Sequence, residues 1–203
     1  MARDYRMRRR ADALDQTRER IVQATMQVHD EKGVAPATFA EIAKRAGVGQ
    51  ATLSRHFPTL GHLVRACGQH VWQEMRPPVP DAAPAVFAGA KTSEERLTRL
   101  VEELDAFYRR GALRLGLAAR DRQLVPELDG FLTAVEAGIG ALIKEALAGQ
   151  EHAIPVVTAL TAFPVWSQFQ ALDLPAPERT ALSVRILGCA IKAARQIRPA
   201  GAC

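Results

Sequence analysis

Residues 38–57 read TFAEIAKRAGVGQATLSRHF, and this stretch decides the fold. Thr38 and Glu41 have the Thr-x-x-Glu spacing of a capping box, in which each side chain satisfies a free backbone N–H at the start of a helix. Apolar residues then recur at helical intervals as far as Ala46. Gly47 follows, and glycine readily adopts the left-handed conformation that ends a helix. The pattern predicts a short helix that ends in a tight glycine turn.

A second short helix is expected to begin near Gly49. Leu53 and Phe57 are four residues apart, so both point toward the interior. The residues left facing outward are Gln50, Ala51, Thr52, Ser54, Arg55 and His56. Two short helices joined in this way form a helix-turn-helix, whose second helix places its N-terminal residues in the major groove of DNA.

The positive charge of the chain is concentrated in its N-terminal part. The 203 residues carry a formal net charge of +5. Residues 1–76 hold 13 Lys and Arg against 8 Asp and Glu, whereas residues 77–203 hold 14 of each kind. All of the excess therefore lies on the segment with the predicted helix-turn-helix, where it suits a polyanion. An ordinary solvated basic face is the alternative interpretation of a surplus this small.

The sequence predicts an all-α chain in four parts. Residues 1–16 are polar and basic and are expected to form a flexible arm, and residues 17–60 the helix-turn-helix domain. Residues 61–76 are expected to form a connecting helix. Four prolines between residues 76 and 84 then interrupt the helical pattern, which marks a domain boundary. In the remaining domain, residues 77–203, helices are predicted over 92–110, 126–147, 155–172 and 177–197, with a short kinked helix between Gly111 and Pro126.

The sequence gives little support for other classes of protein, such as disulfide-bonded proteins, membrane proteins or enzymes. Cys67, Cys189 and Cys203 are widely spaced and odd in number, which indicates reduced thiols and no disulfide framework. No run approaches the ~20 apolar residues of a membrane helix. We expect a cytoplasmic protein without a membrane partner, a metal or a cofactor. Neither a Gly-x-Ser-x-Gly nor a His-Glu-x-x-His motif is present, so no enzymatic activity is predicted.

The chain resembles the TetR/AcrR-type transcriptional regulators. The matching residues are Thr17-Arg-Glu-Arg-Ile, Glu31-Lys-Gly, and Thr38 to Phe57 followed by Pro58. The resemblance implies a homodimer with a DNA-binding domain and a divergent helical domain that binds a small effector. It also implies that Gln50 and Ala51 face base edges, and that phosphates are held by Thr38, Thr52 and His56.

Several positions differ from the family pattern. Many relatives have Tyr where this chain has Ser54 and Lys where it has Leu60, and both residues often contact phosphate. Gly49 replaces the usual N-cap Ser at a cost of about a few tenths of a kcal/mol. His29 stands where an aromatic residue is usual and is interpreted as a core histidine. Arg55 and the basic arm could supply the missing phosphate contacts.

Seven of the 11 aromatic residues lie in the second domain, and some of them suggest a binding pocket. An apolar or amphipathic effector could be held there by Phe107, Phe131, Phe163 and Trp166. Gly138 and Gly140 interrupt a helix at about 1 kcal/mol each, unless a neighbour needs the room. The alternative is that these aromatic residues are ordinary core residues.

Apolar stripes on the last helices predict a dimer seam. The stripes consist of Val156, Leu160, Phe163 and Trp166, then Val184, Leu187, Ile191 and Ala194. Two helices from each subunit could form a four-helix seam, or the stripes could belong to the domain's own core. A homodimer matches a palindromic double-stranded DNA operator.

The hypothesis that unites these patterns is a homodimeric repressor released from its operator by a small effector. The alternatives are a thiol- or metal-responsive regulator and a DNA-binding protein without an effector. The residues that motivate the metal- and thiol-responsive alternatives are His56, His62, Cys67, His70 and Cys189.

Overall fold

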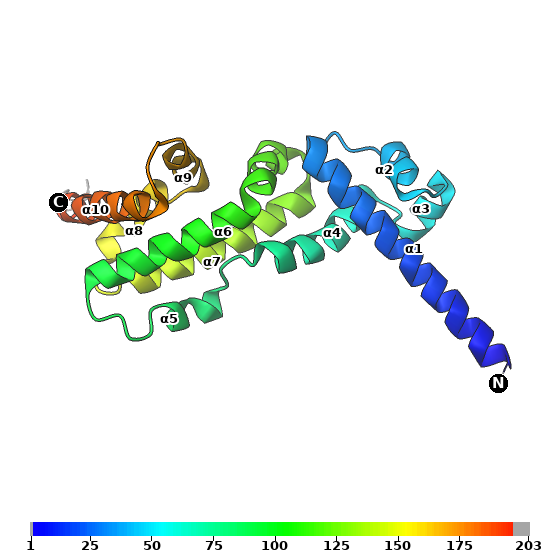
Figure 1. Cartoon of the computed structure of the whole chain (residues 1–203), viewed down its shortest axis with the longest axis horizontal. Coiled ribbons are helices and arrows are strands. Elements are labelled where there is room, and N and C mark those ends of the chain that lie inside the picture. The colour runs from blue at the N-terminus through cyan, green and yellow to red at the C-terminus, as the bar shows by residue number, and fades with distance from the viewer. Residues whose placement is uncertain (1, 197–203) are drawn as a thin grey trace, which may run out of the picture. The chain divides into compact units, whose positions relative to one another are not determined.

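The structure is a computed structural model that describes residues 2–196, without the side chains of residues 2–4, 6 and 10. Within that range every regular element is a helix, which confirms the predicted fold class (Figure 1). The first four helices are α1 (Ala2–Lys32), α2 (Phe39–Ala46), α3 (Gln50–His56) and α4 (Leu60–Met75). The helices that follow are α5 (Ala83–Val86), α6 (Ser93–Asp121), α7 (Pro126–Ala146), α8 (Ile154–Leu160), α9 (Phe163–Gln170) and α10 (Ala176–Ala194). Short 3-10 turns occupy Pro80–Ala82, Arg122–Leu124 and Glu151–Ala153.

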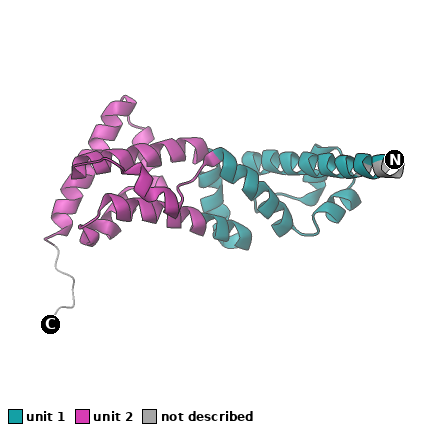
Figure 2. Ribbon diagram, turned by 90° about the horizontal axis from the view of Figure 1, so that it is seen from below, with its two compact units in different colours: residues 1–74, 113–132 teal, residues 75–112, 133–203 magenta. Residues whose placement is uncertain are grey.

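The chain divides into two compact units (Figure 2). Unit 1 comprises Met1–Glu74 and Leu113–Leu132, and unit 2 comprises Met75–Ala112 and Thr133–Cys203. The division after Glu74 lies beside the proline-rich boundary of the sequence. The sequence, however, places residues 113–132 in the second domain, whereas they pack with the N-terminal unit. Helices α6 and α7 each contribute residues to both units.

The core of unit 1 is built by the apolar faces of the first four helices. Ile21, Ile42, Leu53 and Leu63 are fully buried, one from each helix, and Phe57 is buried beside them. The guanidinium of Arg18 lies 4.5 Å from the centre of the Phe57 ring and covers it. Because Leu53 and Phe57 are buried in the core, the opposite face of α3 points away from it, as the sequence predicts.

Residues 2–16, which the sequence predicts as part of a flexible arm, are helical, because α1 begins at Ala2. No Gly or Pro interrupts residues 2–32, so the helix that starts in the core can continue outward. The side chains described between Tyr5 and Gln16 are exposed. The basic segment is therefore helical, and the side chains of Arg3, Arg6 and Arg10 lie outside the described ones.

Two helix boundaries in the second half of the chain differ from the predictions. The expected kink after Gly111 is absent, because α6 continues through Gly111 and Gly116 to Asp121. A glycine keeps its N–H and its helical hydrogen bond, and it costs only about 1 kcal/mol relative to alanine. Conversely, the single helix expected over 155–172 is divided at Thr161–Ala162 into α8 and α9. Pro164 has no N–H to donate and occupies the first turn of α9, where none is needed.

Gly138 allows two backbones of unit 2 to approach each other closely. A Cβ at this position would lie 1.9 Å from the carbonyl oxygen of Pro78. A Cβ at Gly140 would meet nothing within 4 Å. The expectation that a neighbour needs the room is therefore confirmed for Gly138 and not for Gly140. Among the described helices, none is long and apolar enough to cross a membrane.

Candidate functional site

The turn between α2 and α3 has the geometry that the sequence predicts. The N–H of Glu41 donates to Oγ1 of Thr38 over 3.3 Å, and the N–H of Thr38 donates to Oε2 of Glu41 over 3.1 Å. Gly47 ends α2 with a φ of 64°, in the left-handed region. The N–H of Val48 then donates to the carbonyl of Ala43 over 3.0 Å, and Val48 packs against the core. The start of α3 is thus positioned by local hydrogen bonds.

Two ion pairs fasten α2 to the end of α1. The guanidinium of Arg45 donates to both oxygens of Glu31, over 2.6 and 2.8 Å. The ammonium of Lys32 pairs with Glu41 and, together with Thr38, lowers the pKa of that carboxyl to about 2. Lys32 and Arg45 are therefore already engaged, although they count toward the positive charge of this segment.

The outward face of α3 carries the residues that the sequence predicts to contact DNA. Gln50, Ala51, Ser54 and Arg55 are exposed. Residues spaced in this way along a helix lie on one side of it. Thr52 is half-buried, and Gly49 is exposed and offers no side-chain cap to α3. Within the described residues Arg55 has no ion-pair partner, so its charge is free for a phosphate.

Two predicted phosphate ligands are less available than the resemblance implies. The hydroxyl of Thr38 donates to Oε2 of Glu41 over 2.7 Å, so a phosphate would compete with the capping box. The Nε2 atom of His56 is buried without a hydrogen-bond partner among the described residues. Contact with a backbone phosphate through Nε2 would therefore require the ring to move. Lys44, which lies outside the predicted contact set, is exposed on α2 without a described ion pair.

The loop between α1 and α2 is held by a buried carboxylate that the sequence does not reveal. Oδ2 of Asp121 accepts hydrogen bonds from the N–H groups of Val34 and Ala35, over 2.7 and 3.1 Å. Arg120 donates to Oδ1 over 2.8 Å and also to the carbonyl of Lys32. These bonds, the Arg120 pair first, lower the pKa of the Asp121 carboxyl. The end of α6 thus fixes the approach to the helix-turn-helix.

A second connection joins three helices of unit 1. Arg114 of α6 donates to both oxygens of Asp30 in α1, over 2.8 and 2.9 Å, and pairs with Glu74 of α4. These two acids raise the pKa of Arg114 above its usual range. Such bidentate pairs add geometric specificity as well as energy. They hold residues 113–121 of α6 on the N-terminal unit.

His29 has the character expected of a core histidine. Its Nε2 atom is buried without a hydrogen-bond partner among the described residues. Burial lowers its pKa to about 4, against the opposing influence of Asp30 and Asp121. The imidazole is therefore neutral at neutral pH.

The described residues offer no support for a thiol- or metal-responsive regulator. Cys67 is buried, and burial raises the pKa of its thiol to about 12, which leaves almost no reactive thiolate. Cys189 is exposed, whereas Cys203 lies outside the described residues. No group of three His, Cys, Asp or Glu side chains suited to a metal ion occurs in the described part of the chain.

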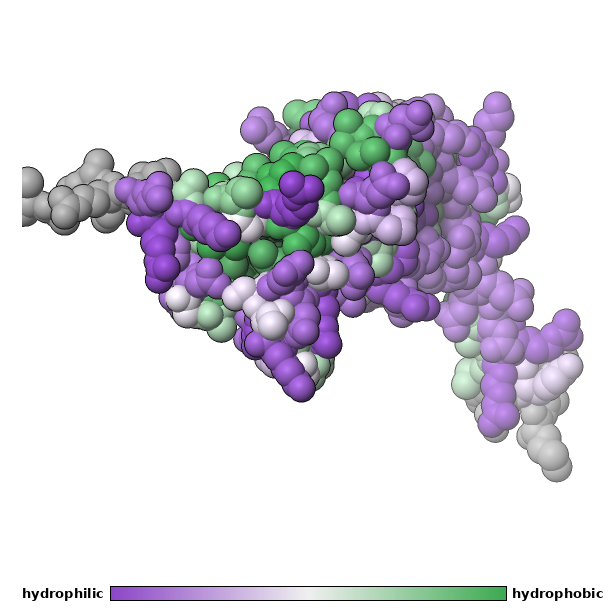
Figure 3. Space-filling view, turned by 60° about the vertical axis from the view of Figure 1, so that its left-hand side comes forward, coloured by the Kyte–Doolittle hydropathy of each residue, from purple (hydrophilic) through white to green (hydrophobic). Residues whose placement is uncertain are grey.

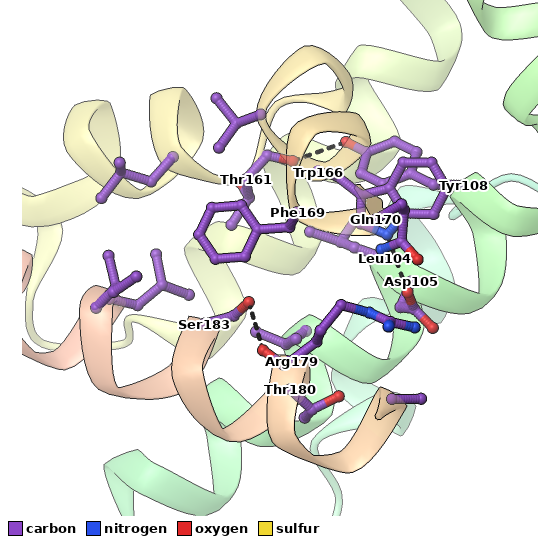
Figure 4. Close-up of a pocket in the computed structure, with 16 residues that line it drawn as sticks. Leu104, Asp105, Tyr108, Thr161, Trp166, Phe169, Gln170, Arg179, Thr180 and Ser183 are labelled. Carbon is purple, nitrogen blue, oxygen red and sulfur yellow. Dashed lines mark hydrogen bonds between the residues drawn. The ribbon is translucent and has the colours of Figure 1, made fainter. Parts of the chain in front are cut away.

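Unit 2 contains a pocket between α6, the α8–α9 segment and α10 (Figure 4). It encloses about 70 Å³ and opens to solvent. Its apolar wall includes Leu104, Trp166 and Phe169. Its polar lining consists of Asp105, Tyr108, Thr161, Gln170, Arg179, Thr180 and Ser183.

Only one of the four aromatic residues predicted for a pocket lines this cavity, namely Trp166. Phe107 is a core residue with 1% exposure, and Phe163 stacks behind Trp166 with ring centres 5.7 Å apart. Phe131 packs edge-on against Trp72 in unit 1. Helical spacing cannot distinguish these locations, because it reports one face of a helix and not what that face meets.

Hydrogen bonds position the polar groups of the pocket. The hydroxyl of Tyr108 donates to the carbonyl of Thr161 over 3.0 Å, and burial raises its pKa. Oδ1 of Asp105 accepts from Nε1 of Trp166 over 2.9 Å. Oδ2 of the same carboxylate accepts from Nε of Arg109 over 2.6 Å. The sequence does not single out Asp105 or Arg179, because neither belongs to a recognisable motif.

The apolar stripe of α10 that the sequence predicts for a dimer interface is mostly buried inside unit 2. Val184, Leu187 and Ile191 are buried within the single chain. A different face of α10, with Leu182 and Ile186, is partly exposed. Partly exposed apolar residues on α8 and α9 are Val156, Leu160, Phe163 and Trp166. Figure 3 shows hydrophobic residues gathered on the surface near the C-terminal end of the described chain.

Comparison with known proteins agrees with this architecture. Residues 21–67 match the family model of bacterial regulatory proteins, tetR family. The HTH-type transcriptional regulator BetI of Escherichia coli O17:K52:H18 is 31% identical over 85 residues, which are 42% of this chain and 43% of BetI. BetI of the K12 strain DH10B is likewise 31% identical over 84 residues, 41% of this chain and 42% of that protein. The chain thus matches less than half the length of these curated relatives.

Solved structures resemble the chain over most of its length. The multidrug binding protein EbrR complexed with imidazole has a TM-score of 0.58 at 22% identity, covering 91% of this chain and 92% of that one. A transcriptional regulator from Aquifex aeolicus VF5 has a TM-score of 0.53 at 16% identity, covering 85% and 98%. At these identities the likeness shows a shared fold.

The described chain therefore combines a helix-turn-helix domain with a helical second unit, as in bacterial transcriptional regulators. The TetR-family match covers residues 21–67, which contain the helix-turn-helix of the chain.

Proposed function

We propose that the protein is a homodimeric repressor that binds a palindromic operator and leaves it when a small effector occupies unit 2. The observation that supports DNA binding most directly is the outward face of α3. Its polar residues are exposed, while Leu53 and Phe57 anchor the helix in the core. The turn before α3 is held by a capping box and a left-handed glycine. A recognition helix needs this combination of exposure and fixed position.

The side chains of α3 have suitable chemistry for a major groove. The amide of Gln50 can bind adenine in a bidentate manner, and the methyl group of Ala51 can contact a thymine methyl. Arg55 and Ser54 can donate to backbone phosphates, which fixes the helix in register. Arg55 takes the principal phosphate role here, because His56 has its Nε2 atom buried.

Dimerisation is supported by the partly exposed apolar residues of α8 to α10 (Figure 3). A two-fold dimer presents two recognition helices to half-sites about 34–36 Å apart, or at multiples of that spacing. An apolar surface of this kind is favoured where a second copy of the chain covers it.

Release by an effector is supported by the course of α6. This helix supplies Leu104, Asp105 and Tyr108 to the pocket, and its last residue, Asp121, holds the loop before α2. A ligand changes DNA affinity only if it binds the DNA-incompetent state better than the competent one. EbrR, which shares the fold, is described as a multidrug binding protein.

The test is a footprint on the DNA upstream of the protein's own gene, combined with the oligomeric state of the purified chain at micromolar concentration. We expect a symmetric protected region and a dimer. A monomer at that concentration would contradict the homodimer, and uniform binding to unrelated DNA would contradict operator recognition.

A further inference from the structure

Arg179 brings a positive charge into the pocket of unit 2, and no acidic side chain of the described residues forms an ion pair with it. Arg179 lies in the first turns of α10 and lines the cavity. Figure 4 shows its side chain extending from α10 across the pocket toward the side formed by α6. Its Nη1 atom donates to the carbonyl of Leu174. Its Nε atom is buried without a hydrogen-bond partner in the described part of the chain.

Asp105, the acidic residue of the pocket lining, is already engaged. One of its oxygens accepts from Trp166 and the other from Arg109, which does not line the pocket. The Arg109 pair supplies the counter-charge of Asp105 from outside the cavity. Among the described residues, Arg179 is therefore left without an ion-pair partner of its own.

A partly buried guanidinium without a counter-ion is unfavourable, because charges are stable in low-dielectric surroundings only when they are paired. A carboxylate satisfies this requirement well, since its two oxygens match the planar donors of arginine. The bond from Arg179 to Leu174 holds the guanidinium against the backbone and so limits its freedom to turn away.

The rest of the lining indicates what the carboxylate should be attached to. Trp166 and Phe169 provide an apolar wall, and Tyr108 keeps its hydroxyl turned to Thr161. Aromatic walls favour flat or branched apolar groups. The pocket opens to solvent, so a ligand held by this wall can keep its polar end near the rim.

We propose that this pocket takes a small aromatic or branched monocarboxylate, with Arg179 binding the carboxylate and Trp166 and Phe169 contacting its apolar part. This inference rests on the proposed effector function and specifies the chemical class of the effector.

Three probes with the same ring and different charge test the proposal, namely phenylacetate, phenylacetamide and phenethylamine. Binding to the full chain is measured by calorimetry and by thermal stabilisation, without DNA. We expect phenylacetate to bind about 10- to 100-fold more tightly than the neutral amide, the range for a charge-assisted hydrogen bond. Tighter binding of phenethylamine would overturn the proposal and would assign the pocket to cations through Asp105. No binding of any probe at millimolar concentration would also overturn it.

Variants of Arg179 separate ligand binding from folding. Arg179→Gln should bind phenylacetate and phenylacetamide equally, whereas Arg179→Lys should keep part of the preference. Arg185→Gln is the matched control, because Arg185 is exposed on the same helix and does not line the pocket. An unchanged preference in Arg179→Gln would refute the role of Arg179. Because DNA is absent from these measurements, a failure of operator binding would leave their outcome intact.

Discussion

The carboxylate of Asp121 accepts a hydrogen bond from the backbone N–H of Val34 over 2.7 Å, although 87 residues separate the two in sequence. The same oxygen accepts from the N–H of Ala35. Asp121 is 2% exposed, so its charge is stabilised by these donors and by Arg120 and hardly by water. The end of α6 thereby determines the conformation of the loop that leads into the helix-turn-helix.

Replacement of Asp121 by Asn should destabilise unit 1. The neutral amide weakens the bonds to Val34 and Ala35 and removes the pair with Arg120, so we expect stability to fall by about 1–3 kcal/mol. Urea unfolding followed by circular dichroism measures this change. Asp129→Asn is the control, since Asp129 forms an exposed pair with Arg122 and should cost less than about 1 kcal/mol. Equal destabilisation in the two variants would contradict the structural role of Asp121.

Gly138 and Gly140 offer a matched pair of substitutions in one helix. Gly138→Ala would bring a Cβ to 1.9 Å from the carbonyl oxygen of Pro78, so we expect overpacking to destabilise the fold by about 1–3 kcal/mol. Gly140→Ala meets no atom within 4 Å and should gain about 0.5–1 kcal/mol from helix propensity. Thermal unfolding compares the two variants. Stabilisation by Gly138→Ala would show that the close approach to Pro78 is wrong.

His29 should make folding stability depend on pH between about 6.5 and 4. Its pKa falls from the usual value of 6.5 to about 4 on folding, so the unfolded chain binds a proton first as the pH falls. Stability is therefore full above about pH 6.5 and decreases by up to about 3 kcal/mol as the pH falls to about 4. Urea unfolding at several pH values measures the slope, and the part of the range above about pH 5.5 is the most informative because most carboxylates titrate below it.

The variant His29→Phe should flatten this dependence, because it removes the group that titrates and keeps an aromatic ring in the core. The exposed His152 provides the control, and His152→Gln should leave the slope unchanged. A slope in His29→Phe equal to that of the original chain would assign the pH dependence to other groups.

Gln50 is expected to read a base in the operator. Gln50→Ala should relax the preference at one base pair of each half-site by about 1–3 kcal/mol, because alanine cannot form the bidentate hydrogen bonds. Gel-shift titrations on the operator and on single-base variants measure this preference. Gln73→Ala, on the exposed side of α4, serves as the control. Unaltered base preference in Gln50→Ala would remove the base-reading role.

The basic extension of α1 is expected to bind backbone phosphates. Deletion of residues 2–12 should weaken operator binding and lower the slope of log affinity against log salt by about 0.9 for each phosphate that the deletion leaves unbound. The exposure of Arg8 and Arg9 leaves both available for this role. A slope identical to that of the full chain would mean that this segment does not touch DNA.

Helix ends were predictable wherever the signal was local. The capping box of Thr38 and the left-handed Gly47 both follow from residues within a few positions of one another. The kink expected near Gly111 was wrong, because glycine lowers helix propensity without breaking the hydrogen bonds. The helical form of residues 2–16 was not predicted, and it is possible because polar residues without Gly or Pro can extend a helix that is anchored elsewhere.

The sequence alone determined the all-α fold, the helix-turn-helix and the residues exposed on its second helix, because caps and helical periodicity act over three or four residues. Only the tertiary structure decided that Asp121 holds the loop at Val34, that Phe131 packs in unit 1 and that Arg179 enters the pocket without an acidic partner among the described residues. Those relationships join residues far apart in the chain, and a periodic pattern shows which face is buried but not which partner buries it.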